Sequence, residues 1–244
     1  MEYDLTLFEK GLEELGIALS QEQKKQFITY YEYLVEKNKV MNLTAITEYD
    51  EVILKHFLDS LSIVKVGSFD QKKLAGKSVI DIGTGAGFPG IPLKIAFPEL
   101  KITLLDSLNK RVNFLNEVIE MLGLKDVTAI HGRAEDYAKQ KEHREKYDFC
   151  VSRAVANLST LSEYCIPFVK EGGSFISYKS GKIDEELKQA EMAVKILGGK
   201  VQNVVKFPLM DTDMDRSFVV IKKMKPTAKK YPRKAGLPSK EPLA

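Results

Sequence analysis

The segment from Val79 to Gly90, with the sequence VIDIGTGAGFPG, constrains the fold of this chain more than any other. A short apolar run typical of a buried strand leads directly into a turn that contains four glycines. Glycine is needed where the backbone adopts a positive φ angle or approaches a ligand closely. A strand, a glycine-rich turn and a following helix are typical of the ligand-binding unit of a doubly wound α/β sheet. The segment therefore predicts an α/β fold with a cofactor at this turn.

The chain downstream of Gly76 alternates strand-like and helix-like segments, which predicts a mostly parallel, doubly wound sheet. Gly172 and Gly173 are expected to form a turn before the fifth strand. The last two strands have no helix between them and read as a hairpin, so one strand should run antiparallel. The seven strands are expected at residues 78–82, 101–105, 127–131, 147–152, 174–178, 202–207 and 217–222.

Three regions of different character divide the chain. Residues 1–66 carry apolar side chains at helical spacing and predict a helical N-terminal appendage. Ser20 and Gln23 resemble a capping box at the start of one of its helices. The sheet domain is expected over residues 67–224, followed by a basic tail over residues 225–244.

The charge is unevenly distributed between the body and the tail. The whole chain carries a formal charge of +3, but from Lys222 onward eight basic side chains face one acid, Glu241, so this part carries +7 and the remainder −4. A basic tail on an acidic body predicts a phosphate-binding arm. A solvated tail that only aids solubility is the alternative.

The composition narrows the protein class further. No apolar run reaches the roughly 18–20 residues needed to span a bilayer, and the N-terminus lacks the apolar core of a signal peptide. Cys150 and Cys165 form no CxxC pair, which argues against a zinc site or a disulfide framework. We therefore expect a monomeric cytoplasmic protein without a metal and without membrane contact.

Asp81 helps to decide which cofactor the glycine turn binds. Gly85, Gly87 and Gly90 fit GxGxxG, which by itself also permits a dinucleotide. A carboxylate at the end of the strand would repel a pyrophosphate, whereas it suits the ammonium and sulfonium groups of S-adenosylmethionine. Asp106, at the end of the second strand, can accept hydrogen bonds from ribose hydroxyls in either cofactor class. We therefore expect S-adenosylmethionine at this turn.

The run DIGTGAGFPGIPL, residues 81–93, resembles the ribosomal RNA small-subunit methyltransferase G family, also called the glucose-inhibited division protein B family. The similarity covers nearly all 244 residues. Its supporting segments are Asn42–Thr44, His56–Ser60, Ser152–Ala154, Asp215–Ser217 and Tyr231–Pro238.

The resemblance implies a fold, a reaction and a set of donor contacts. It implies a class I, Rossmann-like methyltransferase fold that uses S-adenosylmethionine to methylate N7 of a guanosine in 16S ribosomal RNA. The implied donor contacts are Gly83, Phe88, Ala134, Glu135 and Arg153, with Ala134 and Glu135 at the adenine. Naked RNA, the mature small subunit and an assembly intermediate stay open as substrates.

The sequence offers positioning residues rather than a catalytic acid or base. Guanine N7 carries a free lone pair, so its methylation is mainly a matter of orientation. Arg153, at the end of the fourth strand, should face the donor carboxylate or an RNA phosphate, and Arg216 is a second positioning candidate. His56 either contacts RNA or packs in the core. The candidates for RNA binding are Arg133, Lys179, Arg216, Lys229, Lys230, Arg233 and Lys234.

Other methyl-transfer reactions leave different traces. Amino-group methylation of bases commonly uses Asn/Asp-Pro-Pro-Tyr/Phe after the fourth strand, where this chain has Ser152-Arg153-Ala154-Val155. Pyrimidine C5 methylation needs a cysteine nucleophile, but both cysteines fall inside expected core elements. A methyltransferase for another RNA, a protein or a small molecule remains an alternative, as do a NAD-binding oxidoreductase and an RNA-binding protein that has lost catalysis.

Overall fold

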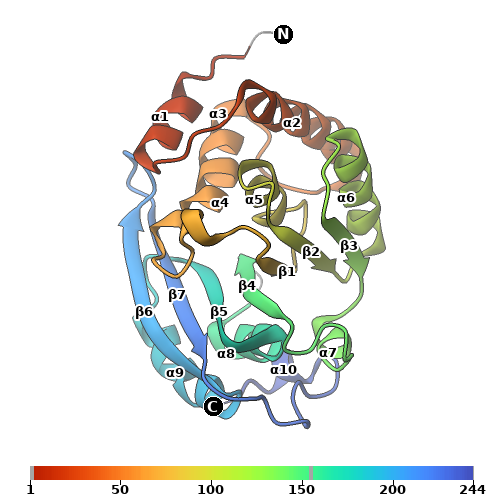
Figure 1. The fold of residues 1–244 in the computed structure, drawn as a ribbon, viewed down its shortest axis with the longest axis vertical. Helices are drawn as coiled ribbons and strands as arrows, with labels where there is room; N and C mark the ends of the chain where they lie inside the picture. The colour runs from red at the N-terminus through yellow and green to blue at the C-terminus, as the bar shows by residue number, and fades with distance from the viewer. Residues whose placement is uncertain (1–2, 154–155, 244) are drawn as a thin grey trace.

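A twisted seven-stranded sheet crosses the middle of the molecule, with helices on both of its faces (Figure 1). The computed structural model describes residues 3–153 and 156–243. The strands lie in the order β3-β2-β1-β4-β5-β7-β6. Their bounds are β1 (Ser78–Ile82), β2 (Lys101–Asp106), β3 (Val127–His131), β4 (Tyr147–Arg153), β5 (Val169–Ser180), β6 (Gly199–Pro208) and β7 (Asp215–Lys223).

The sheet confirms the predicted class. Strands β1 to β5 pair in parallel, and β7 runs antiparallel to both of its neighbours, β5 and β6. The hairpin of β6 and β7 therefore contributes the single reversed strand that the sequence predicted. The carboxyl ends of β1 to β5 consequently meet at one edge of the sheet, which is where ligands bind in such folds.

Successive side chains of β1 point to opposite faces of the sheet and join two separate cores. Val79 packs with the N-terminal helices and with the helices that follow β1 and β2, whereas Ile80 and Ile82 pack with the helices on the other face. The first face is covered by α1 (Thr6–Glu14), α2 (Gln21–Met41), α3 (Tyr49–Val52), α4 (Asp59–Leu61), α5 (Gly90–Ala96) and α6 (Asn109–Met121). The second face is covered by α7 (Ala134–Tyr137), α8 (Leu158–Cys165), α9 (Asp184–Ile196) and α10 (Leu237–Lys240).

The N-terminal helices form as their sequence predicts, with one irregular stretch. The Ser20 hydroxyl accepts from the Gln23 amide at 3.2 Å and the Gln23 side chain accepts from the Ser20 amide at 2.8 Å, so the capping box is confirmed. Between α3 and α4 the chain forms a π-helical turn, Ile53–Leu58. Such turns are often found at functional sites, and this one carries Lys55 and His56.

The turn predicted at Gly172 and Gly173 is wrong, because β5 runs through both residues. The pairing with β4 shifts register here, and Gly172 adopts a φ of 78° within the irregularity. A Cβ atom on Gly173 would lie 2.6 Å from the backbone oxygen of Asp148. The glycines therefore accommodate a bulge inside a strand instead of ending one.

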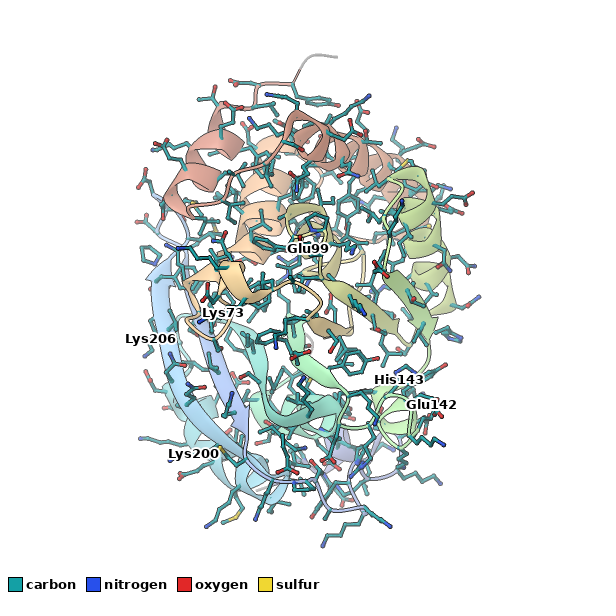
Figure 2. The ribbon with its side chains drawn as sticks, in the orientation of Figure 1. Lys73, Glu99, Glu142, His143, Lys200 and Lys206 are labelled. Carbon is teal, nitrogen blue, oxygen red and sulfur yellow. The ribbon has the colours of Figure 1, made fainter. Side chains whose placement is uncertain are left out.

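Lysine side chains protect the β6 edge of the sheet from pairing with a strand of another chain. Lys200 and Lys206 lie on β6, the edge strand (Figure 2). Lys206 also pairs with Asp184 of α9 at 2.8 Å. Lysines on an edge strand oppose pairing with another chain.

The C-terminal segment folds back along the α7 and α8 side of the sheet (Figure 1). Arg144 holds its beginning by donating to the backbone oxygens of Thr227 at 2.7 Å and Tyr231 at 2.9 Å. The side chains of Tyr231 and Pro238 are buried. The segment is therefore docked on the domain, and phosphate binding by its exposed lysines stays a prediction.

Candidate functional site

The glycine turn lies between β1 and α5, at the carboxyl edge of the sheet. Gly83, Gly85 and Gly87 adopt φ angles of 71°, 63° and 101°, a region that favours glycine. Gly90 is needed for a different reason, since a Cβ atom there would lie 2.2 Å from Leu104 of β2. The glycine pattern thus reflects both the path of the turn and the close packing of α5 on the sheet.

Asp81 lies fully buried beneath this turn. Its Oδ2 atom accepts from the Thr84 hydroxyl at 2.7 Å and from the Gly90 amide at 2.9 Å. Its Oδ1 atom is buried and has no hydrogen-bond partner among the described residues. Burial raises the pKa of this carboxyl to about 7, against the opposing effect of those two hydrogen bonds. Asp81 therefore fixes the turn through one oxygen and leaves the other unsatisfied.

The N-terminal helices brace the turn from outside. The buried Tyr30 of α2 donates its hydroxyl proton to the Ala86 backbone oxygen. The Phe88 ring stacks on His56, with 4.4 Å between ring centroids and 18° between planes. The Arg153 guanidinium lies 5.1 Å from the centre of the same Phe88 ring, which is within cation–π range.

Two cavities adjoin the turn and share Gly83. The first, which we call the loop cavity, has a volume of about 390 Å³, and the second, the third-strand cavity, about 310 Å³. Of the predicted donor contacts, Gly83, Gly85, Phe88, Asp106 and Arg153 line the loop cavity, while Gly83, Ala134 and Glu135 line the third-strand cavity.

Asp106, Gly87 and Asp81 have structural roles at the turn. Asp106 accepts from the Gly85 amide at 2.9 Å through Oδ2, which ties β2 to the turn. Gly87 packs beneath the turn, where an added Cβ would lie 2.8 Å from the Tyr30 hydroxyl. Neither Gly87 nor Asp81 lines either cavity. A direct donor contact by these two residues stays a prediction.

A third cavity, the basic cavity, has a volume of about 530 Å³ and shares His56 and Arg153 with the loop cavity. Arg153 reaches it because it ends β4 and pairs with Tyr178, and Arg216 because it is the second residue of β7 and lies opposite Ser180. Its walls are formed by Ile46, Lys55, His56, Asp59, Arg153, Tyr178, Lys179, Ser180, Glu186 and Arg216.

Asp59 joins the two arginines of the basic cavity and was not predicted. It is 5% exposed, and its Oδ2 accepts from Arg153 at 2.8 Å while its Oδ1 accepts from Arg216 at 2.8 Å. A buried carboxylate needs such charged partners. The signal in the sequence is an acidic residue inside the apolar stretch from Val52 to Val66.

His56 is held as a neutral ring. Its Nε2 atom lies 2.8 Å from the Thr44 hydroxyl and its Nδ1 atom 3.2 Å from Arg153. Loss of solvent contact, together with the charge of Arg153, lowers the pKa of the imidazole to about 3. His56 is therefore uncharged at neutral pH and acts as a packing surface for Phe88 and Arg153.

The predicted RNA contacts are distributed over several places. Lys179 lies on the basic cavity and pairs with Glu186 at 2.6 Å, and Arg216 joins it there. Arg133 borders the third-strand cavity instead. The side chains of Lys229, Lys230 and Lys234 are exposed.

Arg233, another predicted RNA contact, has an acidic partner inside the domain. Its guanidinium binds the buried Glu163 carboxylate in bidentate fashion, with 3.0 Å from Nε to Oε1 and 2.7 Å from Nη2 to Oε2. It is therefore engaged by a partner within the domain, and RNA binding by Arg233 stays a prediction. Ala154, in the segment that follows Arg153, lies outside the described residues.

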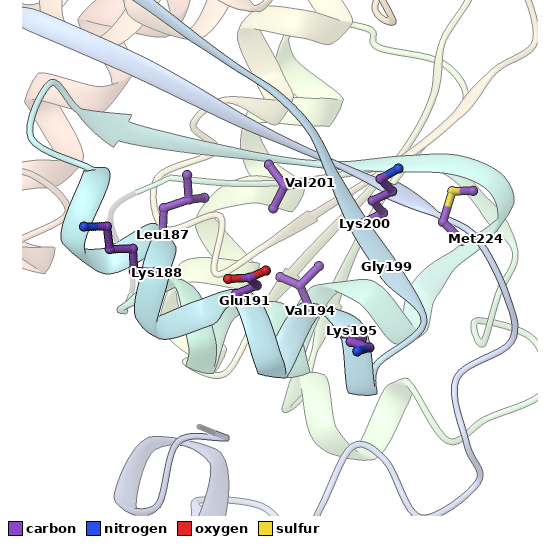
Figure 3. A pocket seen from close by; sticks show the side chains of 9 residues that line it. All are labelled: Leu187, Lys188, Glu191, Val194, Lys195, Gly199, Lys200, Val201 and Met224. Atoms are coloured by element: carbon purple, nitrogen blue, oxygen red, sulfur yellow. The ribbon is translucent and has the colours of Figure 1, made fainter.

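A further cavity of about 580 Å³ lies away from this site, between α9 and the start of β6 (Figure 3). Leu187, Val194 and Met224 contribute its apolar wall. Because β6 runs parallel to β5, its first residues lie at the opposite edge of the sheet from the glycine turn. This cavity therefore belongs to a different part of the molecule.

The described ranges offer neither a metal-binding cluster nor a membrane-spanning helix. Residues 3–153 and 156–243 contain no group of three or more His, Cys, Asp and Glu side chains arranged to hold a metal ion. His143, for example, lies beside Tyr147, with 2.7 Å between Nδ1 and the phenol oxygen (Figure 2). None of the helices in these ranges is both long and apolar enough to cross a bilayer.

Comparison with a solved structure supports the fold. The O-methyltransferase from Bacillus cereus in complex with SAH superposes with a TM-score of 0.56 over 80% of this chain and 91% of its own, at 16% identity. The similarity at that level concerns the fold alone and agrees with the predicted class I architecture.

Sequence comparison identifies the family. The family described as rRNA small subunit methyltransferase G matches residues 23–215. Ribosomal RNA small subunit methyltransferase G of Lachnoclostridium phytofermentans is 57% identical, with 98% of each chain covered. The protein of the same name from Desulforamulus reducens is 53% identical, with 99% of each chain covered. This chain therefore belongs to the rRNA small subunit methyltransferase G family.

Proposed function

We propose that this chain transfers the methyl group of S-adenosylmethionine to N7 of a guanosine in 16S ribosomal RNA. The observation that carries the proposal is the junction of two cavities at His56 and Arg153, one beside the glycine turn and one lined by basic side chains. A methyl donor and a nucleotide in these cavities would meet at that junction. Membership of the family supports RNA of the small ribosomal subunit as the substrate.

The residues around the turn fit S-adenosylmethionine better than a dinucleotide. The unsatisfied Oδ1 of Asp81 belongs to a buried carboxyl that is ionised above its pKa of about 7, which suits a cation and disfavours a pyrophosphate. Arg153 and the Gly83–Gly85 backbone would hold the carboxylate end, Asp106 the ribose, and Ala134 and Glu135 the adenine. When bound, the sulfonium supplies an activated methyl group, so the demanding chemistry belongs to the cofactor.

The basic cavity suits a nucleotide. Lys55, Arg153, Lys179 and Arg216 surround it, and Asp59 fixes the direction of both arginines. A guanosine must be unstacked to enter such a pocket, and charged groups that face its phosphates can hold it there. We propose Arg153 and Arg216 as the residues that position the acceptor nucleotide.

The acidic and histidine side chains of the basic cavity are all held by partners, which favours guanine N7 over acceptor atoms that must lose a proton. His56 is neutral with both nitrogens engaged, Asp59 is held by two arginines, and Glu186 is paired with Lys179. These groups are thus poorly suited to remove a proton. Guanine N7 needs no proton removal, so positioning suffices for it.

The setting of the reaction follows from the same proposal. We propose that the chain acts as a cytoplasmic monomer on RNA within a ribosomal particle. Because the resemblance leaves naked RNA, the mature subunit and an assembly intermediate open, all three belong in the test.

The test supplies radiolabelled S-adenosylmethionine with unmethylated small subunits or with the naked RNA. Chemical cleavage at N7-methylguanosine then locates the label at a single guanosine. Label on protein, on a pyrimidine or on an exocyclic amino group would contradict the proposed acceptor. A matched reaction with Arg216→Ala should retain donor binding and transfer the methyl group more slowly.

A further inference from the structure

The third-strand cavity has a wall that comes from the far end of the chain. Gly236 and Ser239 line it together with Gly132, Ala134, Glu135 and Tyr164. The Gly236 amide donates to Oε1 of Glu135 at 2.8 Å, across about a hundred residues of sequence. The C-terminal segment thus touches a residue that the proposed function places at the adenine of the donor.

An ion pair clasps this segment to α8. Arg233 donates to Glu163 through its backbone amide at 2.7 Å and through Nε and Nη2, and Glu163 is fully buried. Bidentate arginine–carboxylate pairs fix direction as well as distance. The Arg233 side chain also reaches the Glu241 backbone oxygen at 2.7 Å, which closes a loop over residues 233–241.

The exposed lysines of the same segment do not share in this clasp. Lys234 and Lys240 are exposed, whereas Tyr231 and Pro238 of the same segment are buried. Thr160 of α8 adds another inward contact, since its hydroxyl donates to the Pro238 backbone oxygen at 3.1 Å. The segment therefore makes specific hydrogen bonds on the side that faces the domain and carries lysine side chains on the side that faces solvent.

We propose that residues 231–240 form a wall of the purine site of the methyl donor, and that the Arg233–Glu163 pair holds this wall closed. Glu135 would then use Oε1 to hold the wall through Gly236 and keep Oε2 for the ligand. The ligand class is an adenosine-bearing thioether or sulfonium. This inference rests on the proposed function, because it takes the third-strand cavity as the adenine site.

The experiment measures binding of S-adenosylhomocysteine and of 5′-methylthioadenosine to the full chain by calorimetry, without RNA. Arg233→Ala should weaken both ligands by the same factor, at least tenfold, since both carry the adenosine. Lys240→Ala removes an exposed charge from the same segment and should leave both affinities within twofold. Equal affinity of Arg233→Ala and the parent chain would overturn the proposal.

A second measurement covers the case in which Arg233→Ala fails to fold. In the parent chain, hydrogen exchange of the amides of residues 233–240 should slow at least tenfold on addition of S-adenosylhomocysteine, because the ligand opposes opening of the wall. Unchanged exchange in this segment, with slower exchange at the glycine turn, would reject the wall and keep the donor site. No binding of S-adenosylhomocysteine by the parent chain would instead reject the donor site itself.

Discussion

The proposed role of Asp59 follows from its contacts with Arg153 and Arg216. It is buried under two guanidinium groups, each within 2.8 Å of one of its oxygens. A long arginine side chain at a cavity wall can adopt many rotamers unless a partner such as a carboxylate holds it in one of them. Asp59 is thus a positioning residue that orients Arg153 and Arg216 for the acceptor.

Asp59→Asn should slow methyl transfer to RNA more than it weakens donor binding. Loss of a hydrogen bond between charged groups costs about 1–3 kcal/mol, so we expect a tenfold to hundredfold lower kcat. Single-turnover kinetics with the small subunit measure the rate, and calorimetry with S-adenosylhomocysteine measures donor affinity. Asp184→Asn, which breaks only the exposed pair with Lys206, is the control and should behave as the parent chain. An unchanged rate in Asp59→Asn would remove Asp59 from the site.

Asp81 should make donor binding depend on pH. Burial raises its pKa to about 7, and an ammonium group can pair only with its ionised form. Donor affinity should therefore rise as the pH increases toward 7 and fall about tenfold per unit well below it. Calorimetry with S-adenosylhomocysteine between pH 5.5 and 8, in about five steps, measures this dependence.

The raised pKa of Asp81 has the opposite effect on the stability of the chain without a bound donor: this stability decreases as the pH rises. The folded state holds the Asp81 proton more firmly than the unfolded state, so its contribution to stability decreases between about pH 4 and about pH 7. Asp81→Asn should remove the pH dependence of donor affinity while lowering the affinity itself. An identical pH profile in parent and variant would show that Asp81 does not face the donor.

At the scale of elements, the glycine turn separates into a part that faces the core and a part that faces the cavity. A Cβ atom on Gly90 would collide with Leu104, whereas one on Gly85 would meet no atom within 4 Å. Gly85 also lines the loop cavity. The two glycines are therefore required for different reasons.

Gly90→Ala should destabilise the chain by about 1–3 kcal/mol through overpacking. Gly85→Ala should cost about 1 kcal/mol for its positive φ, yet weaken donor binding at least tenfold, because its methyl group enters the cavity. Urea unfolding and calorimetry on the two variants separate the effects. Normal donor affinity in a folded Gly85→Ala variant would place the donor elsewhere.

The N-terminal helices contribute to the site through Tyr30. Its hydroxyl donates to Ala86 inside the turn, and its ring stacks on Phe57 at 5.6 Å. Tyr30→Phe keeps the ring but leaves a buried carbonyl without its donor, which costs about 1–3 kcal/mol. We expect lower stability and weaker donor binding together. Tyr33→Phe, which loses only a contact with the exposed Glu117, is the control in the same unfolding and calorimetry measurements.

Elements with a strong local signal were predictable, and those that depend on distant contacts were not. The strands and the Ser20 capping box followed from apolar runs and cap chemistry. Gly172 and Gly173 were read as a turn because glycine marks turns and bulges alike, and only the pairing of β4 with β5 distinguishes them. The π-helical turn at Ile53–Leu58 likewise has no local signature beyond its apolar residues.

For the molecule as a whole, the site is assembled from three distant parts of the chain. The N-terminal segment contributes His56 and Asp59, the sheet contributes the glycine turn and Arg153, and the C-terminal segment contributes Gly236. Sequence reasoning could place candidates after each strand, because the topology brings these ends together. It could not see that Glu163 turns Arg233 inward, since that contact joins residues 70 positions apart.

The most direct test of the central claim is the location of the transferred methyl group. Small subunits or naked RNA that lack the modification are incubated with the chain and labelled S-adenosylmethionine, and the 16S RNA is cleaved chemically at N7-methylguanosine. We predict label at N7 of one guanosine. Label at any other atom, or no transfer to RNA from a chain that binds the donor, would contradict the account.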